Sequence, residues 1–292
     1  MKGLRAPGRI RFRRVGLVSK PLGNALRLAG QLEKALRRRG VAVVFDEATA
    51  AALERPDGVP RRRIAREADL VIALGGDGTL LSVARAAPAD TPVLGINVGV
   101  LGFLAGLRRT EALARLDDVL TGRFREDRRR RLDVVVPDGP HRGTYRALND
   151  AVLNKEAIAR ISTFSISVAS QPVARFRADG VIVATPTGST AYNLSAGGPI
   201  LHPELAAVVV TPICPHTLAQ RPLVVRSGEA IGVVVLDRRG PRVHLTLDGQ
   251  EGFPVAPGSP IEIRSSRSSV TLLRAPESDH FRTLSEKLNW GV

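Results

Sequence analysis

Over the first part of the chain, short apolar runs alternate with stretches whose apolar residues recur every three or four positions. Buried strands are predicted at the apolar runs, which are residues 14–19, 41–45, 68–74 and 91–97. Helices are predicted at the other stretches, which are residues 25–36 with a stop near Gly40, residues 79–87 and residues 107–120. Strands that alternate with helices predict a parallel sheet with helices on both faces.

The pattern changes about 120 residues into the chain. Residues 123–131 are a charge-dense junction, and we interpret the run Arg128–Arg131 within it as the solvated start of a strand. The alternative, binding of polyphosphate or nucleic acid, is disfavoured because no aromatic residues are interleaved for base stacking. Beyond them, short β-branched or alternating runs are separated by Gly, Pro and Asp, which is typical of a sandwich-like all-β domain. We therefore expect an α/β domain with a parallel sheet over residues 1–122 and an all-β domain over residues 123–274. The tail from about 275 to 292, with a short helix near its end, is expected to pack back on the α/β domain.

The composition is that of a globular chain with an unusual choice of basic residues. Hydrophobic residues make up 43% and charged residues 24% of the 292 positions, which excludes a disordered or fibrous protein. Lys and Arg outnumber Asp and Glu by 43 to 28, yet only five of the basic residues are lysines. None of these completes the phosphate loop G-x-x-x-x-G-K-[ST], so nucleotide chemistry needs a different loop. The net charge of +15 fits anionic partners such as nucleic acid, a membrane surface or phosphorylated small molecules, and more simply a solvated surface.

Cysteine content and hydropathy narrow the class of protein further. The single cysteine, Cys214, permits no intrachain disulfide, and no apolar run approaches the length that spans a bilayer. No apolar signal-sequence core follows the basic N-terminal residues, so we expect a cytoplasmic protein. The alternative is an Arg-rich organellar presequence, although the basic segment is short and has no serine before residue 19. Cys214 and His216 have no partners at zinc-ligand spacing, and we interpret their segment as a turn. No residue is therefore assigned as a metal ligand.

The sharpest local motif lies between a predicted strand and a predicted helix and reads Gly75, Gly76, Asp77, Gly78 and Thr79. Its glycines let the backbone approach a phosphate closely, and the helix N-terminus offers free N–H groups. A carboxylate in such a loop suits proton removal from an attacking hydroxyl, or contact with a phosphate-bound metal ion. The alternative is a tight turn in which Asp77 only caps the helix. A dinucleotide fingerprint G-x-G-x-x-G is disfavoured, because Leu81 stands where its third glycine belongs.

Two motifs in the second half of the chain have the chemistry to hold a sugar. At Asn149 and Asp150, an amide and a carboxylate can bind two vicinal ribose hydroxyls, although an Asx-turn is the simpler interpretation of the pair alone. Residues 179–199 are a strand that runs into a loop dense in Thr, Ser, Gly and Pro, which supplies hydroxyl and N–H groups without charge. Tyr192 adds an aromatic face for a flat ring. The alternative is a cluster of β-turns, which the length of the loop disfavours.

Together, these motifs resemble those of the NAD kinase family. The resemblance rests on GGDGT, on LND at residues 148–150, on DGVIVATPTGSTAYNLSAGGPI from residue 179, and on TPICPHTLAQRPLVV and LDGQ further along. It extends from about Val15 to the C-terminus. GGDGT alone is shared with diacylglycerol-type lipid kinases and phosphofructokinases, so a lipid kinase is the alternative enzyme. A basic nucleic-acid-binding protein is the alternative from another class, and it rests on net charge alone.

The resemblance implies a kinase that transfers the terminal phosphate of ATP, or of polyphosphate, to the 2′-hydroxyl of the adenosine ribose of NAD. Asp77 then corresponds to the group that activates this hydroxyl, and Gly75, Gly76, Gly78 and Thr79 correspond to the loop that contacts phosphate. A larger set corresponds to positions that bind NAD: Asn149, Asp150, Arg160, Arg177, Asp179, Thr190, Ala191, Tyr192, Asn193, Leu194, Ser195 and Gln250. A divalent ion, Mg²⁺, held mainly by the triphosphate, would neutralise charge.

The resemblance also bears on partners. It implies a homodimer or homotetramer with the all-β domain as the interface, and we expect neither nucleic acid nor membrane as a partner. The sequence departs from the expected pattern at residues 154–156, where it reads NKE. The basic extension before Val15 has no clear counterpart.

Overall fold

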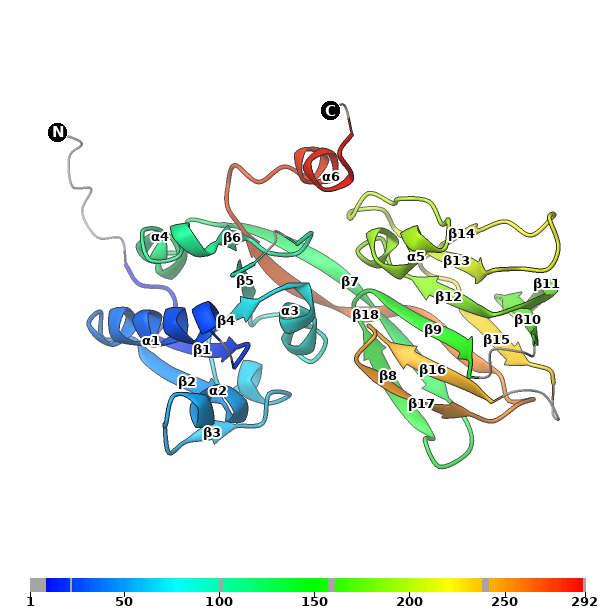
Figure 1. Ribbon diagram of the computed structural model, residues 1–292, viewed down its shortest axis with the longest axis horizontal. Coiled ribbons are helices and arrows are strands. Elements are labelled where there is room, and N and C mark those ends of the chain that lie inside the picture. The colour runs from blue at the N-terminus through cyan, green and yellow to red at the C-terminus, as the bar shows by residue number, and fades with distance from the viewer. Residues whose placement is uncertain (1–8, 22, 100–101, 157–160, 238–241, 291–292) are drawn as a thin grey trace. The chain divides into compact units, whose positions relative to one another are not determined.

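The chain divides into two compact units, each with its own sheet architecture (Figure 1). The computed structural model describes residues 9–21, 23–99, 102–156, 161–237 and 242–290. Unit 1 comprises Met1–Arg128 and Val270–Val292, and unit 2 comprises Arg129–Ser269. Two long strands contribute residues to both units: β7 (Arg125–Val136) and β18 (Ile261–Arg274).

Unit 1 is built on a parallel sheet with the strand order β5-β4-β1-β2-β3. Its strands are β1 (Arg14–Ser19), β2 (Ala42–Asp46), β3 (Gly58–Val59), β4 (Leu70–Gly75), β5 (Val93–Asn97) and β6 (Leu107–Arg108). The end of β18 pairs in parallel with β5, with Leu272 beside Val93. Its helices are α1 (Gly23–Arg37), α2 (Glu47–Ala52), α3 (Asp77–Ala84), α4 (Leu116–Leu120) and α6 (His280–Leu288), with 3-10 turns η1 (Ile64–Arg66) and η2 (Arg109–Glu111).

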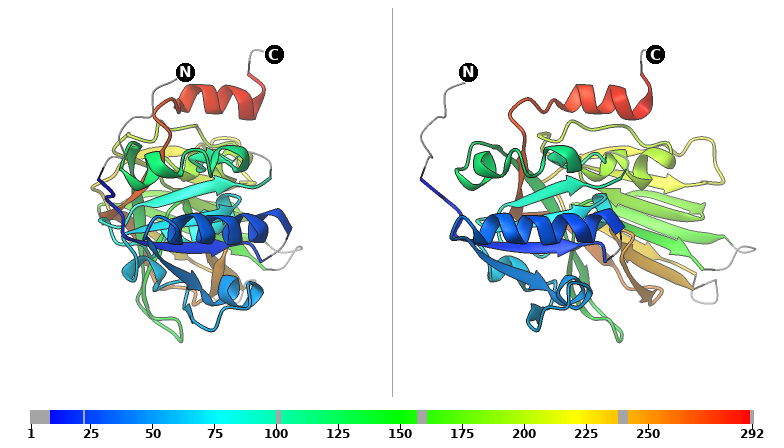
Figure 2. Two further views of the ribbon diagram at one scale, coloured as in Figure 1. Left: turned by 90° about the vertical axis from the view of Figure 1, so that its left-hand side faces the viewer. Right: turned by 60° about the vertical axis from the view of Figure 1, so that its left-hand side comes forward.

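Helices cover both faces of this sheet, as the alternation of elements predicted. Helix α1 lies along the strands (Figure 2), and its apolar positions Ala25, Leu28, Ala29, Leu32, Ala35 and Leu36 are buried. Successive strand residues point to opposite faces, so Ile72 joins the core with α1, whereas Val71 lies beside Ile64 near Gly16. Gly40, with φ of +72°, takes the left-handed conformation just past the end of α1.

The predicted helix over residues 107–120 is wrong in its first half. Leu107 pairs with Ile96 in the short parallel strand β6, and η2 follows, with the Glu111 carboxylate accepting the N–H of Arg108 at 2.9 Å. Only α4 is α-helical, although the apolar residues Ala112, Leu116, Val119 and Leu120 are all buried. The apolar spacing thus identified the buried side chains correctly. The first residues of the segment, however, pair with β5 at the sheet edge and do not form a helix.

Unit 2 consists of antiparallel sheets around one shared hydrophobic core. One sheet has the order β14-β13-β12-β9-β16-β17, and the other runs β11-β10-β15-β18, with β7 pairing with both β18 and β8. The strands are β8 (Gly143–Ala147), β9 (Asp150–Lys155), β10 (Ser162–Val168), β11 (Gln171–Ala178), β12 (Gly180–Ala184), β13 (Ala207–Ile213), β14 (Leu223–Arg226), β15 (Ile231–Val235), β16 (Val243–Leu247) and β17 (Glu251–Val255). Short helical turns η3 (Gly188–Thr190) and α5 (Tyr192–Ser195) follow β12. The predicted fold class, a parallel α/β part followed by a sandwich-like all-β part, is confirmed.

The arginine run that we interpreted as solvated is only half exposed, because it lies within strand β7. Arg128 and Arg130 are exposed, whereas Arg129 and Arg131 are buried, as the alternation of a strand requires. The Arg131 guanidinium donates to the Ser268 hydroxyl and to the Ser269 carbonyl, both at 3.0 Å. Burial, and secondarily the charge of a neighbouring arginine, lowers the pKa of Arg131 to about 10, which leaves it charged at neutral pH.

Candidate active site

The GGDGT motif stands where ligands usually bind in open parallel sheets, at the carboxyl end of β4. Gly75 is the last residue of β4, and Asp77 is the first residue of α3. The N-cap position is taken by Gly76, so the interpretation of Asp77 as a simple helix cap is wrong. The Asp77 carboxylate instead accepts the backbone N–H groups of Phe103 at 2.8 Å and Leu104 at 3.2 Å. These bonds aim a half-buried carboxylate at a fixed position beside the glycine loop.

Glycine is required on both sides of this carboxylate because other atoms occupy the space of a side chain. A Cβ at Gly75 would overlap the Thr79 hydroxyl, and a Cβ at Gly102 would overlap the Asp77 carboxylate. Gly102 therefore lets residues 102–104 approach α3 closely enough for the hydrogen bonds to Asp77 to form, and Gly75 leaves room for the Thr79 side chain beside the end of β4.

A pocket of about 330 Å³ opens beside this loop at the carboxyl edge of the sheet. Its lining comes from the ends of β1, β4 and β5, the residues that follow them, and the start of α1: Lys20, Gly23, Asn24, Ala25, Gly76, Asn97, Val98 and Gly99. Lys20 is exposed, and the first turn of α1 has backbone N–H groups without helical partners. A lysine and a helix N-terminus together favour an anionic ligand such as a phosphate.

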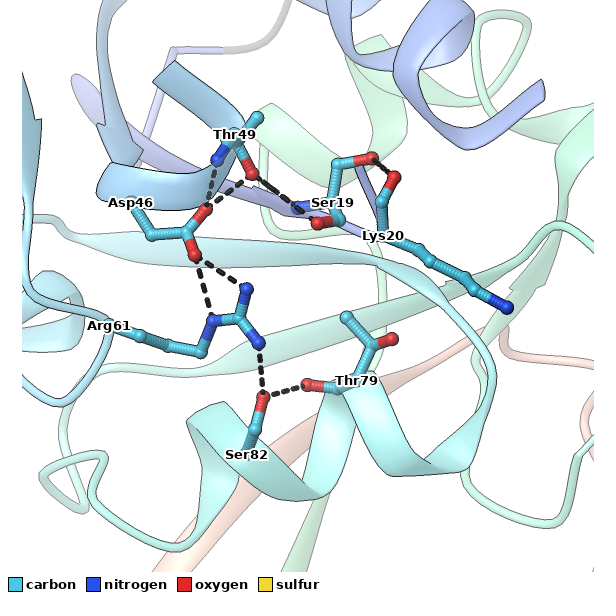
Figure 3. Close-up of polar contacts among 7 residues, drawn as sticks. All are labelled: Ser19, Lys20, Asp46, Thr49, Arg61, Thr79 and Ser82. Atoms are coloured by element: carbon cyan, nitrogen blue, oxygen red, sulfur yellow. Dashed lines mark hydrogen bonds and ion pairs between the residues drawn. The ribbon is translucent and has the colours of Figure 1, made fainter. Parts of the chain in front are cut away.

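A polar network fixes α3 to the neighbouring strand ends (Figure 3). Asp46, at the end of β2, caps α2 through Thr49, whose hydroxyl accepts the N–H of Ser19 at 2.8 Å. The buried Asp46 carboxylate is paired with the Arg61 guanidinium at 2.7 to 2.8 Å. Arg61 in turn donates to the hydroxyl of Ser82 on α3 at 3.4 Å. This network joins the ends of β1 and β2 to the helix that carries Asp77.

In unit 2, the carboxylate of Asp248 holds the backbone of the LND segment. It accepts three consecutive N–H groups, those of Leu148, Asn149 and Asp150, at 3.0, 2.7 and 3.2 Å. Asp248 lies between β16 and β17 with φ of +52°, a left-handed conformation that Asp tolerates better than most residues, and Gly249 follows with φ of +64°. The LDGQ turn thus fixes the position of the Asn149–Asp150 pair.

The two side chains of that pair differ in their environment. Asp150 is only 4% exposed, and its burial, with the nearby Asp248 carboxylate as a second cause, raises its pKa to about 7. The Asn149 Oδ1 atom is buried and has no hydrogen-bond partner among the described residues. An unsatisfied buried amide oxygen is costly, so this atom is a natural acceptor for a ligand hydroxyl or N–H group.

The threonine-rich loop is held together by its own side chains. The Thr185 hydroxyl donates to the carbonyl of Leu148 at 2.6 Å, which ties the loop to the LND segment. Asn193 is fully buried: its amide donates to the carbonyls of Ser189 and Pro199, and it accepts the Thr211 hydroxyl at 2.6 Å. The Asn193 side chain therefore holds the loop.

The other sequence-predicted residues lie around this loop or on neighbouring strands. Tyr192 and Ser195 are exposed, and Thr190, Ala191 and Leu194 are half-buried. Gln250 is exposed in the turn after Asp248, and Arg177 is exposed on β11. Asp179 forms an ion pair with the mostly buried Lys155 at 2.6 Å, which gives the unexpected NKE segment a structural role. Arg160 lies outside the described residues.

Sequence reasoning missed Asp46, Arg61, Asp248 and Arg274, which position the motifs. Asp46 had a local signal, because an Asp directly before Glu47-Ala-Thr49 is a typical helix start. Asp248 lies within the LDGQ segment, which pointed to the family but not to the role of this carboxylate. Arg61 bonds to residues 15 and 21 positions away, and Asp248 and Arg274 bond to residues about 100 and 170 positions away.

Across the described ranges, no group of three or more His, Cys, Asp or Glu side chains is placed to hold a metal ion. No helix in the part of the chain that the structure describes is long and apolar enough to cross a membrane.

Comparison with known proteins agrees with these motifs. Residues 15–124 match the ATP-NAD kinase N-terminal domain, and residues 148–275 match the ATP-NAD kinase C-terminal domain. An NAD kinase of Solibacter usitatus is 42% identical over 281 residues, which cover 94% of this chain and 97% of that protein. The chain belongs to the NAD kinase family. The resemblance inferred from GGDGT, LND and the threonine-rich segment is thereby confirmed.

Two solved structures of NAD kinases share the fold. Yeast NADH kinase complexed with NADH superimposes with a TM-score of 0.85 at 27% identity, covering 96% of this chain and 88% of that one. An NAD kinase from Archaeoglobus fulgidus in complex with ATP gives a TM-score of 0.77 at 26% identity, covering 94% and 98%. Family membership favours the NAD kinase hypothesis over the lipid kinase and nucleic-acid-binding alternatives.

Proposed function

We propose that this NAD kinase transfers the terminal phosphate of ATP to the 2′-hydroxyl of the adenosine ribose of NAD, with Asp77 as the general base. The observation that carries the proposal is the Asp77 carboxylate, fixed by two N–H groups beside a glycine loop at the carboxyl edge of a parallel sheet. The 2′-oxygen forms a bond to the γ-phosphorus, and the bond from that phosphorus to the bridging oxygen breaks. The hydroxyl proton passes to Asp77, and the products are NADP and ADP.

Asp77 keeps the capacity that this role needs. Each of its oxygens accepts one backbone N–H, and a carboxylate oxygen has two acceptor positions. One position on each oxygen is therefore left for a substrate hydroxyl. A fixed base of this kind removes the proton as the new bond forms and orients the nucleophile, which is most of what phosphoryl transfer asks of a protein.

In this proposal, the negative charge of the phosphates is neutralised by a Mg²⁺ ion that binds together with the nucleotide. Mg²⁺ commonly keeps several waters and binds through substrate phosphates with one or two carboxylates, so it needs no protein cage. Asp77 is the carboxylate of the glycine loop, and Lys20 and the N–H groups of the α1 first turn line the adjacent pocket. When bound, Mg²⁺ would offset the negative charge of the phosphates. Inorganic polyphosphate offers the same terminal group and is the second donor to test.

Unit 2 supplies the acceptor side in this proposal. The unpartnered Asn149 Oδ1 and the near-neutral pKa of Asp150 give this pair the means to accept from and donate to ribose hydroxyls. We assign the remaining contacts to Arg177, Asp179, Gln250 and residues 190–195, with Arg160 as a further predicted contact. The domain division, a cytoplasmic location and a homodimer or homotetramer built through the all-β part belong to the same proposal.

The proposal is tested by purified protein offered NAD or NADH in combination with ATP or polyphosphate. The expected result is formation of NADP from NAD and ATP in the presence of Mg²⁺, with loss of turnover when Mg²⁺ is removed by chelation. Formation of the phosphorylated product from polyphosphate but not from ATP would change the donor. Failure to phosphorylate either dinucleotide, with phosphorylation of diacylglycerol instead, would overturn the proposal.

A further inference from the structure

The backbone of residues 103–105 is held from two sides. On one side, the N–H groups of Phe103 and Leu104 donate to the Asp77 carboxylate at 2.8 and 3.2 Å. On the other side, the carbonyls of Phe103 and Ala105 accept from the two terminal nitrogens of Arg274 at 2.7 and 2.9 Å. The guanidinium therefore binds one of the two peptide groups that orient Asp77, the one between Phe103 and Leu104, and anchors the same segment again two residues further on.

Arg274 is well suited to this task. It is the last residue of β18 and only 6% exposed, so its neighbours hold its side chain in place. Its Nε atom pairs with the carboxylate of Asp127 at 3.3 Å, which compensates the buried charge. A planar guanidinium directs its donors at fixed angles, whereas a lysine ammonium is a single flexible point charge. The three acceptors around Arg274 therefore match arginine and not lysine.

Close packing transmits this arrangement to Asp77. A Cβ at Gly102 would overlap the Asp77 carboxylate, and a Cβ at Gly106 would overlap the carbonyl of Leu273, next to Arg274. The segment between these glycines thus has little room to shift. Phosphoryl transfer is sensitive to such shifts, since a misplacement of about 1 Å can slow an enzymatic reaction about 10²-fold.

We propose that Arg274 is a positioning residue for phosphoryl transfer, which fixes the backbone of residues 103–105 and thereby the carboxylate of Asp77. The inference rests on the proposed role of Asp77 as the general base. Arg274 acts through the backbone and not on the substrates, so its loss should lower kcat and leave the KM values for NAD and ATP nearly unchanged.

Two substitutions and one matched control test this role in the full-length protein. Arg274→Met removes the donors, and Arg274→Lys keeps the charge without the planar fork. Arg131→Met is the control, because Arg131 is an equally buried arginine that bonds to Ser268 and Ser269 in unit 2. The measurements are kcat, both KM values, and amide hydrogen exchange of the peptide that contains Phe103 and Leu104.

For Arg274→Met we expect kcat to fall about 10- to 100-fold, KM values within about twofold, and faster exchange of the Phe103 and Leu104 amides. For Arg274→Lys we expect a kcat and an exchange rate between those of Arg274→Met and wild type. If Arg274→Met does not fold, the lysine variant alone tests the inference. The control should match wild type in kcat and in exchange of this peptide. Wild-type kcat or wild-type exchange in both Arg274 variants would overturn the inference and leave the proposed function intact.

Repeating the Arg274→Met substitution in the Asp77→Asn variant distinguishes a failure of this inference from a failure of the proposed role of Asp77. If Arg274 acts through Asp77, then Arg274→Met should lower the residual kcat of Asp77→Asn by no more than about twofold, because the two changes affect one interaction. Fully additive losses would overturn the inference alone. Wild-type turnover by Asp77→Asn itself would overturn the proposed base, and with it this role of Arg274.

Discussion

Asp77 is a single half-buried carboxylate, and its two backbone N–H partners make its position, not its charge alone, the useful property. Asp77→Asn keeps the size of the side chain and removes its capacity to accept a proton. We expect kcat to fall about 10²- to 10⁴-fold, the usual contribution of a positioned base. NAD binding, measured by calorimetry, should persist. Asp90→Asn, which changes an exposed aspartate of the same unit, should retain wild-type kcat, and near-normal turnover by Asp77→Asn would refute the assignment.

Asp150 makes the free energy of unfolding depend on pH. Its pKa is raised from 3.8 to about 7 in the folded protein, so between these values the folded chain binds a proton that the unfolded chain has lost. The stabilisation from this proton is complete below pH 4 and is lost as pH rises towards 7. We expect wild type to lose stability over this range relative to Asp150→Asn, as measured by urea unfolding at several pH values. Asp138→Asn, an exposed aspartate of unit 2, should follow wild type; a parallel pH profile for Asp150→Asn would contradict the prediction.

Single residues were predictable from the sequence where their chemistry lay within a short motif. Asp77, Asn149 and Asp150 stood out because neighbouring residue types suggested phosphate or ribose. Asp248 and Arg274 did not, because Asp248 bonds to residues 98 to 100 positions away and Arg274 to carbonyls 169 to 171 positions away. Local spacing carries no information about such pairs.

At the scale of elements, the Arg61–Asp46 ion pair holds α3 against the ends of the neighbouring strands. Its contribution to stability can be measured by comparison with Arg39, an arginine of similar exposure whose partner is exposed. Arg61 and Arg39 are about equally exposed, at 34% and 33%, but their partners Asp46 and Asp117 are 2% and 65% exposed. Arg61→Met leaves a buried carboxylate without its charge partner, and we expect a loss of about 1–3 kcal/mol in the free energy of unfolding. Arg39→Met should lose less than about 1 kcal/mol. Equal losses in thermal or urea unfolding would show that burial of the partner does not matter here.

Helices and strands were predicted correctly where a segment showed a single hydrophobic periodicity and no tertiary contact opposed it. The predicted strand at residues 14–19 coincides with β1, and the apolar face of α1 was read from its spacing. Helix α3 begins two residues earlier than predicted, because Asp77 adopts helical conformation beside the glycines. The prediction of a helix over residues 107–120 was wrong in its first half, because Leu107 pairs with Ile96 of β5. Helical spacing does not reveal such a tertiary contact.

For the whole molecule, the change from alternating elements to strands alone predicted the fold class correctly, because periodicity reports how segments are buried. The sequence did not predict how β18 is used. The apolar residues at 261–263 and 270–273 are separated by a polar stretch, yet all of them belong to one strand of 14 residues. The first part pairs antiparallel with β15 in unit 2, and Leu272 pairs in parallel with β5 in unit 1. Local spacing contains no record of such a change of partner.

The net charge of +15 is a property of the whole chain, and its effect on function is testable through salt. Both proposed substrates are anions, so a basic surface should speed their encounter, and screening within about 10 Å at 0.1 M salt should weaken this effect. We expect kcat/KM for ATP and NAD to fall several-fold between 50 and 300 mM KCl, while kcat changes little. Sucrose at equal osmolality, which is uncharged, is the control.

The same charge predicts only weak binding of nucleic acid. Random duplex DNA should bind no more tightly than about 1 μM at physiological salt, the range of non-specific contacts. Tight duplex binding together with salt-independent kcat/KM would instead assign the charge to nucleic acid.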